Sequence, residues 1–568
     1  MIILSLHSGL QDSGAALFED YTLLAAVQQE RLTRRKGDGG LPSAAVIEAL
    51  TIAGLPAGRV DALVISRGHY PLSYFHASPP LPTDGGAAGF VDLAMTLAST
   101  SADHPSRIFN SRALLADLGL PPGIPVFFAN HHRAHALSAL FHTDWDRALI
   151  YTADGGGDNV HYSHHLLKDG QLACLFGDDR WLRTPRRVDS LGQLYGLATE
   201  ALGFRANRHE GKLTGLAGYG QATIADDIAR HFSVDDGGLI GSDFASVEAM
   251  GLFLRKAIVG QTPEDAAASV QAVLERVMSR SIECLLDRHD VRRLALAGGV
   301  FANVRLNRCL AGIGGIDEIF IFPGMGDEGL PIGGALDYLL TRDGLPIWLT
   351  NRRRLDDVFW GQAFDQSIDS ILEADLGIVR LPGEPAEVAA GLLAQGLAGA
   401  IFAGRSEFGP RALGNRSILA SPADAAINQR LNARLKRSEF MPFAPCVRAE
   451  DAAAVFDITP VNAYACRFMT ITTSVREAWK ARIPAVVHVD GTARPQIVIP
   501  DRQPLYADIL RRFKAATGLP VLVNTSFNAH EEPIINRPEE CLQALLRDRV
   551  DFVVTPLAVY RRACGSAA

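Results

Sequence analysis

The stretch ALIYTADGGGDN (148–159) is an apolar run that ends in a polar, glycine-rich loop. The same pattern recurs along the first 345 residues, with helical stretches such as Pro263–Arg288 between some of the runs. Alternation of strand, loop and helix is typical of α/β sheets, whose ligands lie outside the strand ends. The other runs and their loops are MIILSLHSGLQDSG (1–14), VFFANHHRAH (126–135), LALAGGVFAN (294–303) and EIFIFPGMGDEG (318–329).

A second α/β unit is expected from residue 366 onward. Its markers are GRSEFGPRALGNRS (404–417), AVVHVDGTARPQIVI (485–499) and GLPVLVNTSFN (518–528). The segment before it is rich in proline, arginine and aromatic residues without clear periodicity, which indicates a connector. The sequence therefore predicts a first domain over 1–345, a connector over 346–365 and a second domain over 366–568, and we find no internal repeat.

Composition excludes several classes of protein. A chain of 568 residues is too long for one core, and 48% hydrophobic with 21% charged residues is ordinary for globular domains. The net charge is −8 without a long basic run, so we expect no nucleic-acid partner. Seven scattered cysteines without a C-x-x-C pair fit a reducing cytoplasm. No leader and no apolar run near ~20 residues is evident, so we expect no membrane association.

Two histidines and two aspartates are candidate metal ligands. His131 and His135 lie four residues apart in a helix-like run, so they share one helix face. Such pairs are more often structural, but Asp154 and Asp327 follow two other strands, where α/β sheets place ligands. A set of two imidazoles and two carboxylates suits iron, manganese or zinc. The alternative for both aspartates is turn formation, which Asp-Gly pairs favour.

Glycine-rich loops indicate a nucleotide site in the first half. They are HSGLQDSGAA (7–16), HEGKLTGLAGYG (209–220) and AGGVFANVRLN (297–307). Glycines let backbone amides approach phosphate oxygens, and Lys212 adds a point charge. Neither a P-loop nor a dinucleotide-binding fingerprint is present, and without a G-x-S-x-G motif there is no support for a covalent acyl-enzyme.

Cations and amides cluster in the second half. The residues are Arg405, Arg411, Arg416, Lys436, Arg437, Asn524, Thr525, Ser526 and Asn528. Guanidinium groups beside amide and hydroxyl groups form a receptor for a planar, phosphate-bearing anion. The alternative is a solvated basic face. We favour the anion site because the cations alternate with Gly-Pro and aromatic residues at strand ends.

Six motifs, in this order, resemble the O-carbamoyltransferases of antibiotic and nodulation-factor biosynthesis, and the resemblance extends from residue 1 to about residue 560. They are NHHRAH (130–135), GKLTGLAGYG (211–220), AGGVFANVRLN (297–307), GRSEFGPRALGNRS (404–417), MPFAP (441–445) and VNTSFN with EEP (523–533). The resemblance implies an N-terminal ASKHA (actin-like ATPase) domain and a C-terminal YrdC-like α/β domain. It also implies that carbamoyl phosphate and ATP, with Mg²⁺, yield carbamoyl adenylate. The carbamoyl group then passes to a hydroxyl of a small-molecule natural product or glycan.

The same resemblance assigns roles to residues. The metal ligands would be His131, His135, Asp154 and Asp327, with ferrous iron the expected ion. Lys212, Gly215, Gly298, Gly299 and Asn303 would hold the nucleotide in the first domain. Arg411, Lys436, Asn524 and Ser526 would hold carbamoyl phosphate and ATP in the second, with the other members of the cation and amide cluster around them. The candidate catalytic residues are His7, Asp12, Lys212 and Arg411.

Two positions depart from the family pattern. Gln11 stands where related chains usually have a histidine near the acceptor, which leaves Asp12 or His7 as the candidate general base. Met441 precedes Pro442 where relatives often have arginine, so Lys436 and Arg437 are both candidates for binding phosphate.

Two other functions remain open from the sequence. One is a threonylcarbamoyl-type, tRNA-modifying transferase, which the acidic balance disfavours. The other is a non-catalytic, nucleotide-regulated ASKHA binding module, which has no use for the histidine pair. The sequence does not name the acceptor, whose pocket we expect variable loops such as residues 70–112 to line. A homodimer is expected only because it is the commonest closed assembly.

Overall fold

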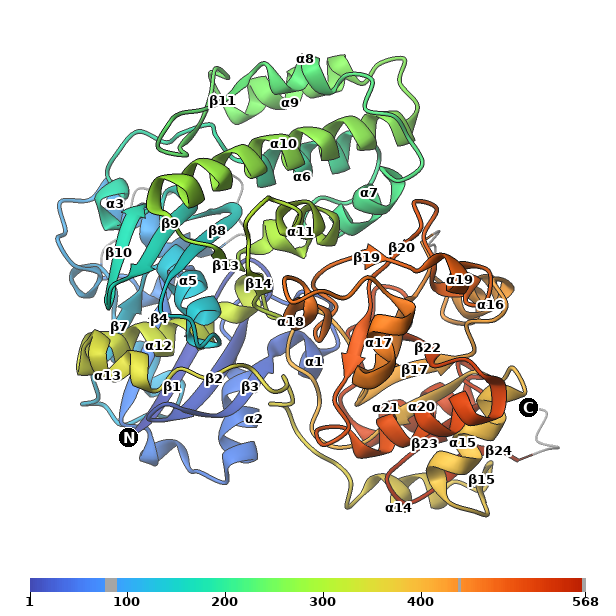
Figure 1. The fold of residues 1–568 in the computed structure, drawn as a ribbon. Helices are drawn as coiled ribbons and strands as arrows, with labels where there is room; N and C mark the ends of the chain where they lie inside the picture. Colours follow the sequence, from blue (N-terminus) through green and yellow to red (C-terminus); the bar gives the residue numbers. More distant parts are fainter. Residues whose placement is uncertain (77–88, 438–440, 564–568) are drawn as a thin grey trace. The chain divides into compact units, whose positions relative to one another are not determined.

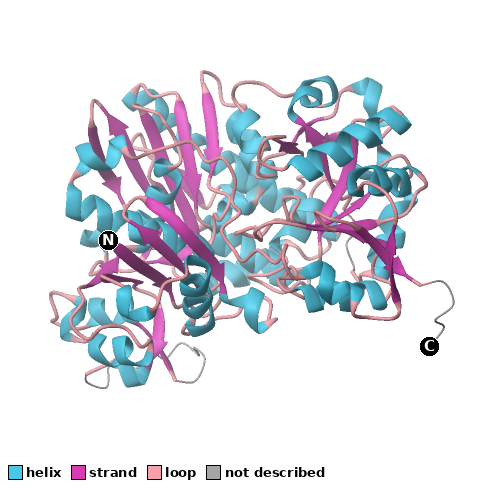
Figure 2. Cartoon of the chain, turned by 90° about the horizontal axis from the view of Figure 1, so that it is seen from below, coloured by secondary structure: helices cyan, strands magenta, loops and turns pink. Residues whose placement is uncertain are grey.

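The computed structural model describes residues 1–76, 89–437 and 441–563, and the chain divides into two compact units (Figure 1). Unit 1 comprises Met1–Thr33 and Gly37–Leu355, and unit 2 comprises Arg34–Lys36 and Asp356–Ala568. Figure 2 shows that each unit combines strands with flanking helices. Both units are mixed α/β, so the predicted fold class is confirmed.

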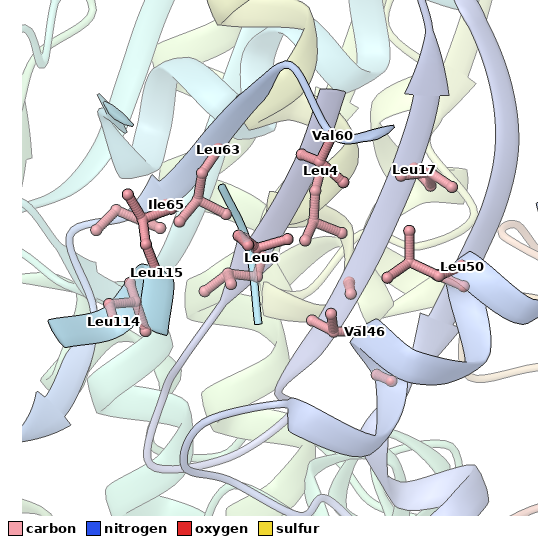
Figure 3. Packing of buried hydrophobic residues seen from close by; sticks show 14 of the residues in the cluster. Leu4, Leu6, Leu17, Val46, Leu50, Val60, Leu63, Ile65, Leu114 and Leu115 are labelled. Carbon is pink, nitrogen blue, oxygen red and sulfur yellow. The ribbon is translucent and has the colours of Figure 1, made fainter. Parts of the chain in front are cut away.

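The first sheet of unit 1 has the strand order β3-β2-β1-β4-β7. Three strands form an antiparallel meander, and β4 and β7 continue the sheet parallel to β1. The strands are β1 (Ile2–His7), β2 (Gly14–Glu19), β3 (Thr22–Gln28), β4 (Ala62–Ser66) and β7 (Val126–Ala129). All residues of β1 and β4 are buried, because α2 (Ser43–Ala53) and α4 (Ser111–Asp117) cover one face and α12 (Leu330–Asp343) contacts both strands. Figure 3 shows Leu4, Leu6, Leu17 and Ile65 packing against residues of α2 and α4.

The second sheet repeats this topology. Its order is β10-β9-β8-β13-β14, again a three-stranded meander followed by two strands parallel to the first. The strands are β8 (Ala148–Gly157), β9 (Val160–Lys168), β10 (Gln171–Phe176), β13 (Arg293–Ala297) and β14 (Glu318–Ile321). This duplication defines the actin-like ASKHA fold expected of the N-terminal domain. The repeat is present in the topology and was not evident in the sequence, where we find no internal repeat.

Two helices that pack closely position part of the candidate site. α5 (His131–Phe141) follows β7, and α12 lies against it. A Cβ on Gly333 would lie 1.8 Å from Ala134 O, so the approach of the two helices requires glycine at this position. The helix expected at Pro263–Arg288 is α10 (Pro263–His289), and Thr262 caps its first turn by accepting a hydrogen bond from Asp265 N.

Unit 2 is built on an eight-stranded mixed sheet with the order β15-β24-β23-β16-β17-β22-β18-β21. The strands are β15 (Ile378–Leu381), β16 (Gly399–Phe402), β17 (Arg416–Ala420), β18 (Ala444–Arg448), β21 (Gln496–Val498), β22 (Val521–Ser526), β23 (Phe552–Val554) and β24 (Val559–Arg562). Helices α15 (Pro385–Ala394) and α20 (Pro504–Thr517) pack against each other beside it. Unit 2 is thus an α/β domain, the fold class expected of the C-terminal domain.

Shorter elements complete both units. The helices are α1 (Gln29–Thr33), α3 (Leu93–Ser99), α6 (Leu191–Ala201), α7 (Glu210–Leu216), α8 (Ala225–Ala229), α9 (Val247–Ala257), α11 (Val304–Ala311), α13 (Leu345–Thr350), α14 (Ile368–Glu373), α16 (Ala426–Arg434), α17 (Ala449–Val455), α18 (Ala463–Cys466), α19 (Glu477–Lys480) and α21 (Pro538–Leu546). The short strands are β5 (His69–Pro71), β6 (Phe90–Asp92), β11 (Phe232–Val234), β12 (Ile240–Ser242), β19 (Thr473–Ser474) and β20 (Thr492–Ala493). α13 falls in the segment predicted as a connector and packs on α12, where Trp348 Nε1 donates to Leu336 O at 3.0 Å. Among the described residues, no helix is long and apolar enough to cross a membrane.

Candidate functional site

Four side chains converge in unit 1. His131 and His135 lie one turn apart on α5, Asp154 lies near the end of β8, and Asp327 begins a short 3-10 helix after β14. One ligand atom from each lies within 4.8 Å of the others. The structure therefore brings together all four residues that the sequence singled out as metal ligands, from three separate segments of the chain.

The geometry of this cluster fits a cation. His135 Nε2 lies 3.2 Å from Asp154 Oδ2, and both imidazole Nε2 atoms lie 3.6 Å from Asp327 Oδ1. These Nε2 atoms and Asp327 Oδ1 are buried without a hydrogen-bond partner among the described residues. Buried polar atoms normally have a hydrogen-bond partner, so several unpartnered polar atoms that point to one spot indicate that a ligand binds there. Two imidazoles and two carboxylates form a donor set that suits a divalent transition metal.

Charge coupling within the cluster is strong. Burial lowers the pKa of His135, but its interactions with Asp154 and Asp327 outweigh burial and raise the pKa to about 9. Burial raises the pKa of Asp154, but His131 and His135 hold it well below the usual range. Without a cation, the carboxylates thus favour protonated imidazoles, so a binding metal displaces protons from this site.

His132, between the two candidate ligands, has a different role. Its Nδ1 lies 2.7 Å from Thr152 Oγ1, and its Nε2 lies 3.1 Å from Val160 O. Burial lowers its pKa well below the usual value, so the ring is neutral. His132 therefore ties α5 to strands β8 and β9.

The candidate general bases lie at and after the end of β1. His7 Nδ1 lies 2.7 Å from Ser66 Oγ, and His7 Nε2 lies 3.7 Å from Asp327 Oδ2. Asp12 has a φ of 55° in the loop between β1 and β2. Sequence reasoning missed Glu328, whose pKa burial and the charge of Asp12 raise to about 8. Its position directly after Asp327 is the signal that could have indicated it. Part of the predicted acceptor loop 70–112 lies outside the described residues.

The predicted nucleotide loops divide into two groups. Gly298 has a φ of 102°, and a Cβ there would lie 2.2 Å from Ala153 O, while Gly299 N donates to Asp154 Oδ2 at 3.2 Å. These glycines therefore lie directly against the cluster of candidate metal ligands. Asn303 instead caps α11 through Leu306 N, and its Nδ2 donates to Gln271 Oε1. Lys212 and Gly215 are buried on α7, which packs against α10.

In unit 2, a buried carboxylate holds the loop 404–417. Glu407 Oε1 accepts hydrogen bonds from Leu413 N at 2.8 Å, Asn415 N at 2.8 Å and Arg416 N at 3.1 Å. Three hydrogen bonds from backbone amides to one carboxylate oxygen are charge-assisted and fix the path of the chain. This loop carries the predicted catalytic residue Arg411.

Side-chain amides hold the carbonyl side of the same loop. Leu413 O accepts from Gln496 Nε2 at 2.7 Å and Gln503 Nε2 at 2.6 Å, and Ala412 O accepts from Asn524 Nδ2 at 3.2 Å. Asn524, predicted to bind substrate, is buried and its Nδ2 also donates to Gln496 Oε1 at 2.7 Å. Its amide nitrogen is thus used to hold the loop.

Two of the predicted arginines bond backbone carbonyls. The Arg416 guanidinium is fully buried 3.8 Å above the Phe402 ring and donates to Ala403 O at 2.9 Å. Arg405 donates to Gly361 O at 2.9 Å and to Trp360 O at 2.7 Å. Both therefore contribute to the framework around Arg411.

Arg494 is a site residue that sequence reasoning missed. It lies directly after β20 and two residues before β21, and burial and the nearby charge of Arg411 lower its pKa well below the usual value. In the part of the chain that the structure describes, no acceptor binds Arg494. A lone arginine at the start of a buried strand, in ARPQIV (493–498), is the sequence signal that could have found it.

The remaining predicted residues lie around Arg437. Arg437 NH1 donates to Thr525 Oγ1 at 2.7 Å, and NH2 donates to Ser526 O and Asn528 O at 2.8 Å each. Lys436 precedes it with a φ of 54°. Residues 438–440, between Arg437 and the motif MPFAP (441–445), lie outside the described residues. The structure thus brings Arg437, Thr525, Ser526 and Asn528 together.

Unit 1 with its cluster of candidate metal ligands and unit 2 with its arginine-rich loops make this a two-domain α/β protein. The model of the carbamoyltransferase N-terminus matches residues 3–336, and that of the carbamoyltransferase C-terminus matches residues 390–562. The chain therefore belongs to the carbamoyltransferase family and is a transferase, as the resemblance implied.

Individual relatives agree with this membership. Nodulation protein NolNO of Sinorhizobium fredii is 32% identical, over 96% of this chain and 78% of its own. Nodulation protein NolO of Bradyrhizobium diazoefficiens is 35% identical, over 76% of this chain and 79% of its own. Among solved structures, full-length HypF in its phosphate- and nucleotide-bound form matches with a TM-score of 0.37 and 13% identity, over 60% of this chain and 56% of that chain.

Proposed function

We propose that this protein is an ATP-dependent O-carbamoyltransferase that forms carbamoyl adenylate in unit 2 and delivers the carbamoyl group to a hydroxyl in unit 1. The observation that carries the proposal is the position of Arg494 near the charge of Arg411, which together with burial lowers the pKa of Arg494. Two neighbouring cations repel each other, and a bound dianion relieves that repulsion. Planar guanidinium groups favour phosphate-bearing anions, and carbamoyl phosphate and ATP are such anions.

Activation takes place in two chemical steps. Water cleaves carbamoyl phosphate to carbamate and phosphate. A carbamate oxygen then attacks the α-phosphorus of ATP, and pyrophosphate leaves with the electron pair of the broken bond. Arg411 and Arg494 stabilise the charge on the phosphate groups, and the bonds from Glu407, Gln496 and Asn524 keep Arg411's loop in place without reorganisation.

In the transfer step the acceptor hydroxyl attacks the carbamoyl carbon and AMP leaves. His131, His135, Asp154 and Asp327 would hold a divalent metal, with ferrous iron our candidate, and the metal supplies Lewis-acid stabilisation of phosphate charge when bound. Gly299 N donates to Asp154 Oδ2 at 3.2 Å and so helps to hold this carboxylate among the candidate metal ligands. His7 and Asp12 are the candidates to accept the hydroxyl proton. The acceptor is a small hydroxylated molecule.

A pyrophosphate-release assay tests the activation step. Wild-type protein is expected to release pyrophosphate from ATP only when carbamoyl phosphate is present. Arg494→Gln removes one of the paired cations, so we expect at least a ~100-fold lower rate, equivalent to about 2.7 kcal/mol of transition-state stabilisation. Arg511→Gln, which removes an exposed arginine that pairs with Asp508 on α20, is the matched control and is expected to keep the wild-type rate. Pyrophosphate release independent of carbamoyl phosphate would refute the proposal.

Separate half-reactions test the division of labour. We expect Arg411→Ala to abolish adenylate formation, and His131→Ala to impair chiefly transfer from preformed carbamoyl adenylate. The measurement is adenylate formation and carbamoyl transfer by each variant, followed by mass spectrometry. Equal loss of both half-reactions in both variants would contradict the division. Threonine- and bicarbonate-dependent modification of tRNA would instead favour the tRNA-modifying alternative.

A further inference from the structure

The turn between β8 and β9 has an unusual backbone for its residues. Asp158 has a φ of 48° and Asn159 a φ of 64°, although neither is glycine. They join Gly157 to its register partner Val160, so they are the two central residues of a tight hairpin. Positive φ at both positions matches the turn type that suits two-residue hairpins, and aspartate and asparagine tolerate it better than other side chains.

This turn contacts His131 in two ways. Asp158 Oδ2 accepts a hydrogen bond from His131 N at 2.7 Å, and the Asp158 side chain is 1% exposed. A carboxylate at this position interacts favourably with the positive, N-terminal end of the α5 dipole. A Cβ on Gly157 would lie 2.2 Å from His131 Cγ, so the backbone of the turn lies directly against the imidazole ring. The turn therefore fixes both the first residue of α5 and the plane of its ring.

A buried arginine holds the carboxylate in place. Arg67 NH1 lies 3.6 Å from Asp158 Oδ2, and Arg67 forms a two-bond pair with Asp179 at 2.7 Å for each bond. Asn130 Nδ2 donates to Asp179 Oδ1 at 2.7 Å. Asn159 Nδ2 donates to Trp181 O at 2.8 Å, which anchors the other side of the turn. These contacts connect the end of β4, the start of α5 and the β8–β9 turn.

We propose that Asp158 is a positioning residue that orients His131 for metal binding, and that Arg67 holds the Asp158 carboxylate in position. The inference rests on the proposed metal site. It gives Asp158, the second aspartate of DGGGDN (154–159), a role that does not involve direct contact with the metal. Residues that orient ligands without touching the metal typically contribute 10- to 100-fold to metal affinity. Asp158 does so through the backbone of His131, whose ring it thereby aims at His135 and Asp154.

Cobalt(II) binding to the full-length protein tests this inference without reference to activity. Asp158→Gly keeps a residue that adopts positive φ but removes the carboxylate, and we expect roughly 10- to 100-fold weaker Co²⁺ binding with an altered visible spectrum. Asp169→Gly is the matched control. Asp169 has a φ of 53° in the exposed β9–β10 turn of the same sheet, so its variant is expected to bind Co²⁺ as the wild type does.

Two further variants keep the test decisive if Asp158→Gly does not fold. Asp158→Asn retains an oxygen that accepts from His131 N, so it is expected to bind Co²⁺ within ~3-fold of wild type and to restore the spectrum. Arg67→Lys keeps the charge but removes the two-bond pair with Asp179, and we expect at least ~3-fold weaker binding. If Asp158→Gly or Arg67→Lys binds Co²⁺ with wild-type affinity, the inference is overturned and the proposed metal site still stands. If wild-type protein binds no Co²⁺, the metal site and the inference both fail.

Discussion

At the residue scale, the candidate metal ligands and the polar residues around Arg411 have different kinds of partners. The four candidate ligands converge because α5, the end of β8 and the loop after β14 meet, and each lies at or near the end of a predicted strand. Arg416 shares its motif with Arg411 and Asn524 lies in the separate motif VNTSFN, yet both donate to the protein's own backbone carbonyls. The path of the loop decides which partners a polar side chain meets, and residue type does not encode it. Sequence reasoning missed Arg494 because it is a lone cation that lies apart from the other arginines and lysines of the second half.

Glu407 gives a prediction at this scale. Glu407→Gln replaces a charged acceptor of three backbone amides with a neutral one, so we expect a loss of about 2 kcal/mol in the free energy of unfolding. Because the loop then no longer holds Arg411, the KM for carbamoyl phosphate should rise about 10-fold. Chemical denaturation and steady-state kinetics measure the two effects. Glu450→Gln, which removes a carboxylate paired with Arg448, is the control, and an unchanged KM in Glu407→Gln would contradict the loop's role.

At the scale of elements, strand positions were predictable and their repetition was not. Buried apolar runs such as β1 and β4 mark strands covered on both faces, and every run quoted from the first half corresponds to a strand. The two sheets of unit 1 share one topology, but the loops and helices inserted after equivalent strands differ in length and sequence. Topology is set by pairing between distant segments, which a single sequence does not display.

Helix packing gives a prediction at the scale of elements. In Gly333→Ala the new Cβ would lie 1.8 Å from Ala134 O, so α12 and α5 must separate. We expect a loss of about 2 kcal/mol or more in the free energy of unfolding, together with weaker metal binding, because Asp327 precedes α12 and the histidines lie on α5. Gly391→Ala in α15 is the matched control. Apart from its chain neighbours and the backbone of its own helix, no described atom lies within 4 Å of its added Cβ, so this variant should be more stable by about 0.5–1 kcal/mol. Equal effects in thermal unfolding would contradict the packing argument.

At the scale of the whole molecule, buried histidines couple the stability of unit 1 to pH. Burial lowers the pKa of His142 to about 4, of His164 to about 3 and of His165 to about 4, from an ordinary value of 6.5. Between pH 6.5 and 4 the unfolded chain therefore binds more protons than the folded chain. The free energy of unfolding must then fall as the pH is lowered through this window, by up to about 1.4 kcal/mol per pH unit for each histidine, and above pH 6.5 these groups cause no change.

His164 isolates one part of this dependence. Its ring stacks on Tyr162 at 5.3 Å, and neither ring nitrogen has a partner among the described residues, so phenylalanine can replace it without loss of a hydrogen bond. We expect His164→Phe to lose less stability than wild type when the pH falls from 7 to 5, by about 2 kcal/mol, as measured by urea unfolding at both pH values. His104→Phe, at an exposed position, is the control. The His164 imidazole stays neutral in the folded state and takes up a proton only on unfolding, so its removal must remove that share of the pH dependence. An identical loss in wild type and His164→Phe would therefore show that this imidazole is not the source.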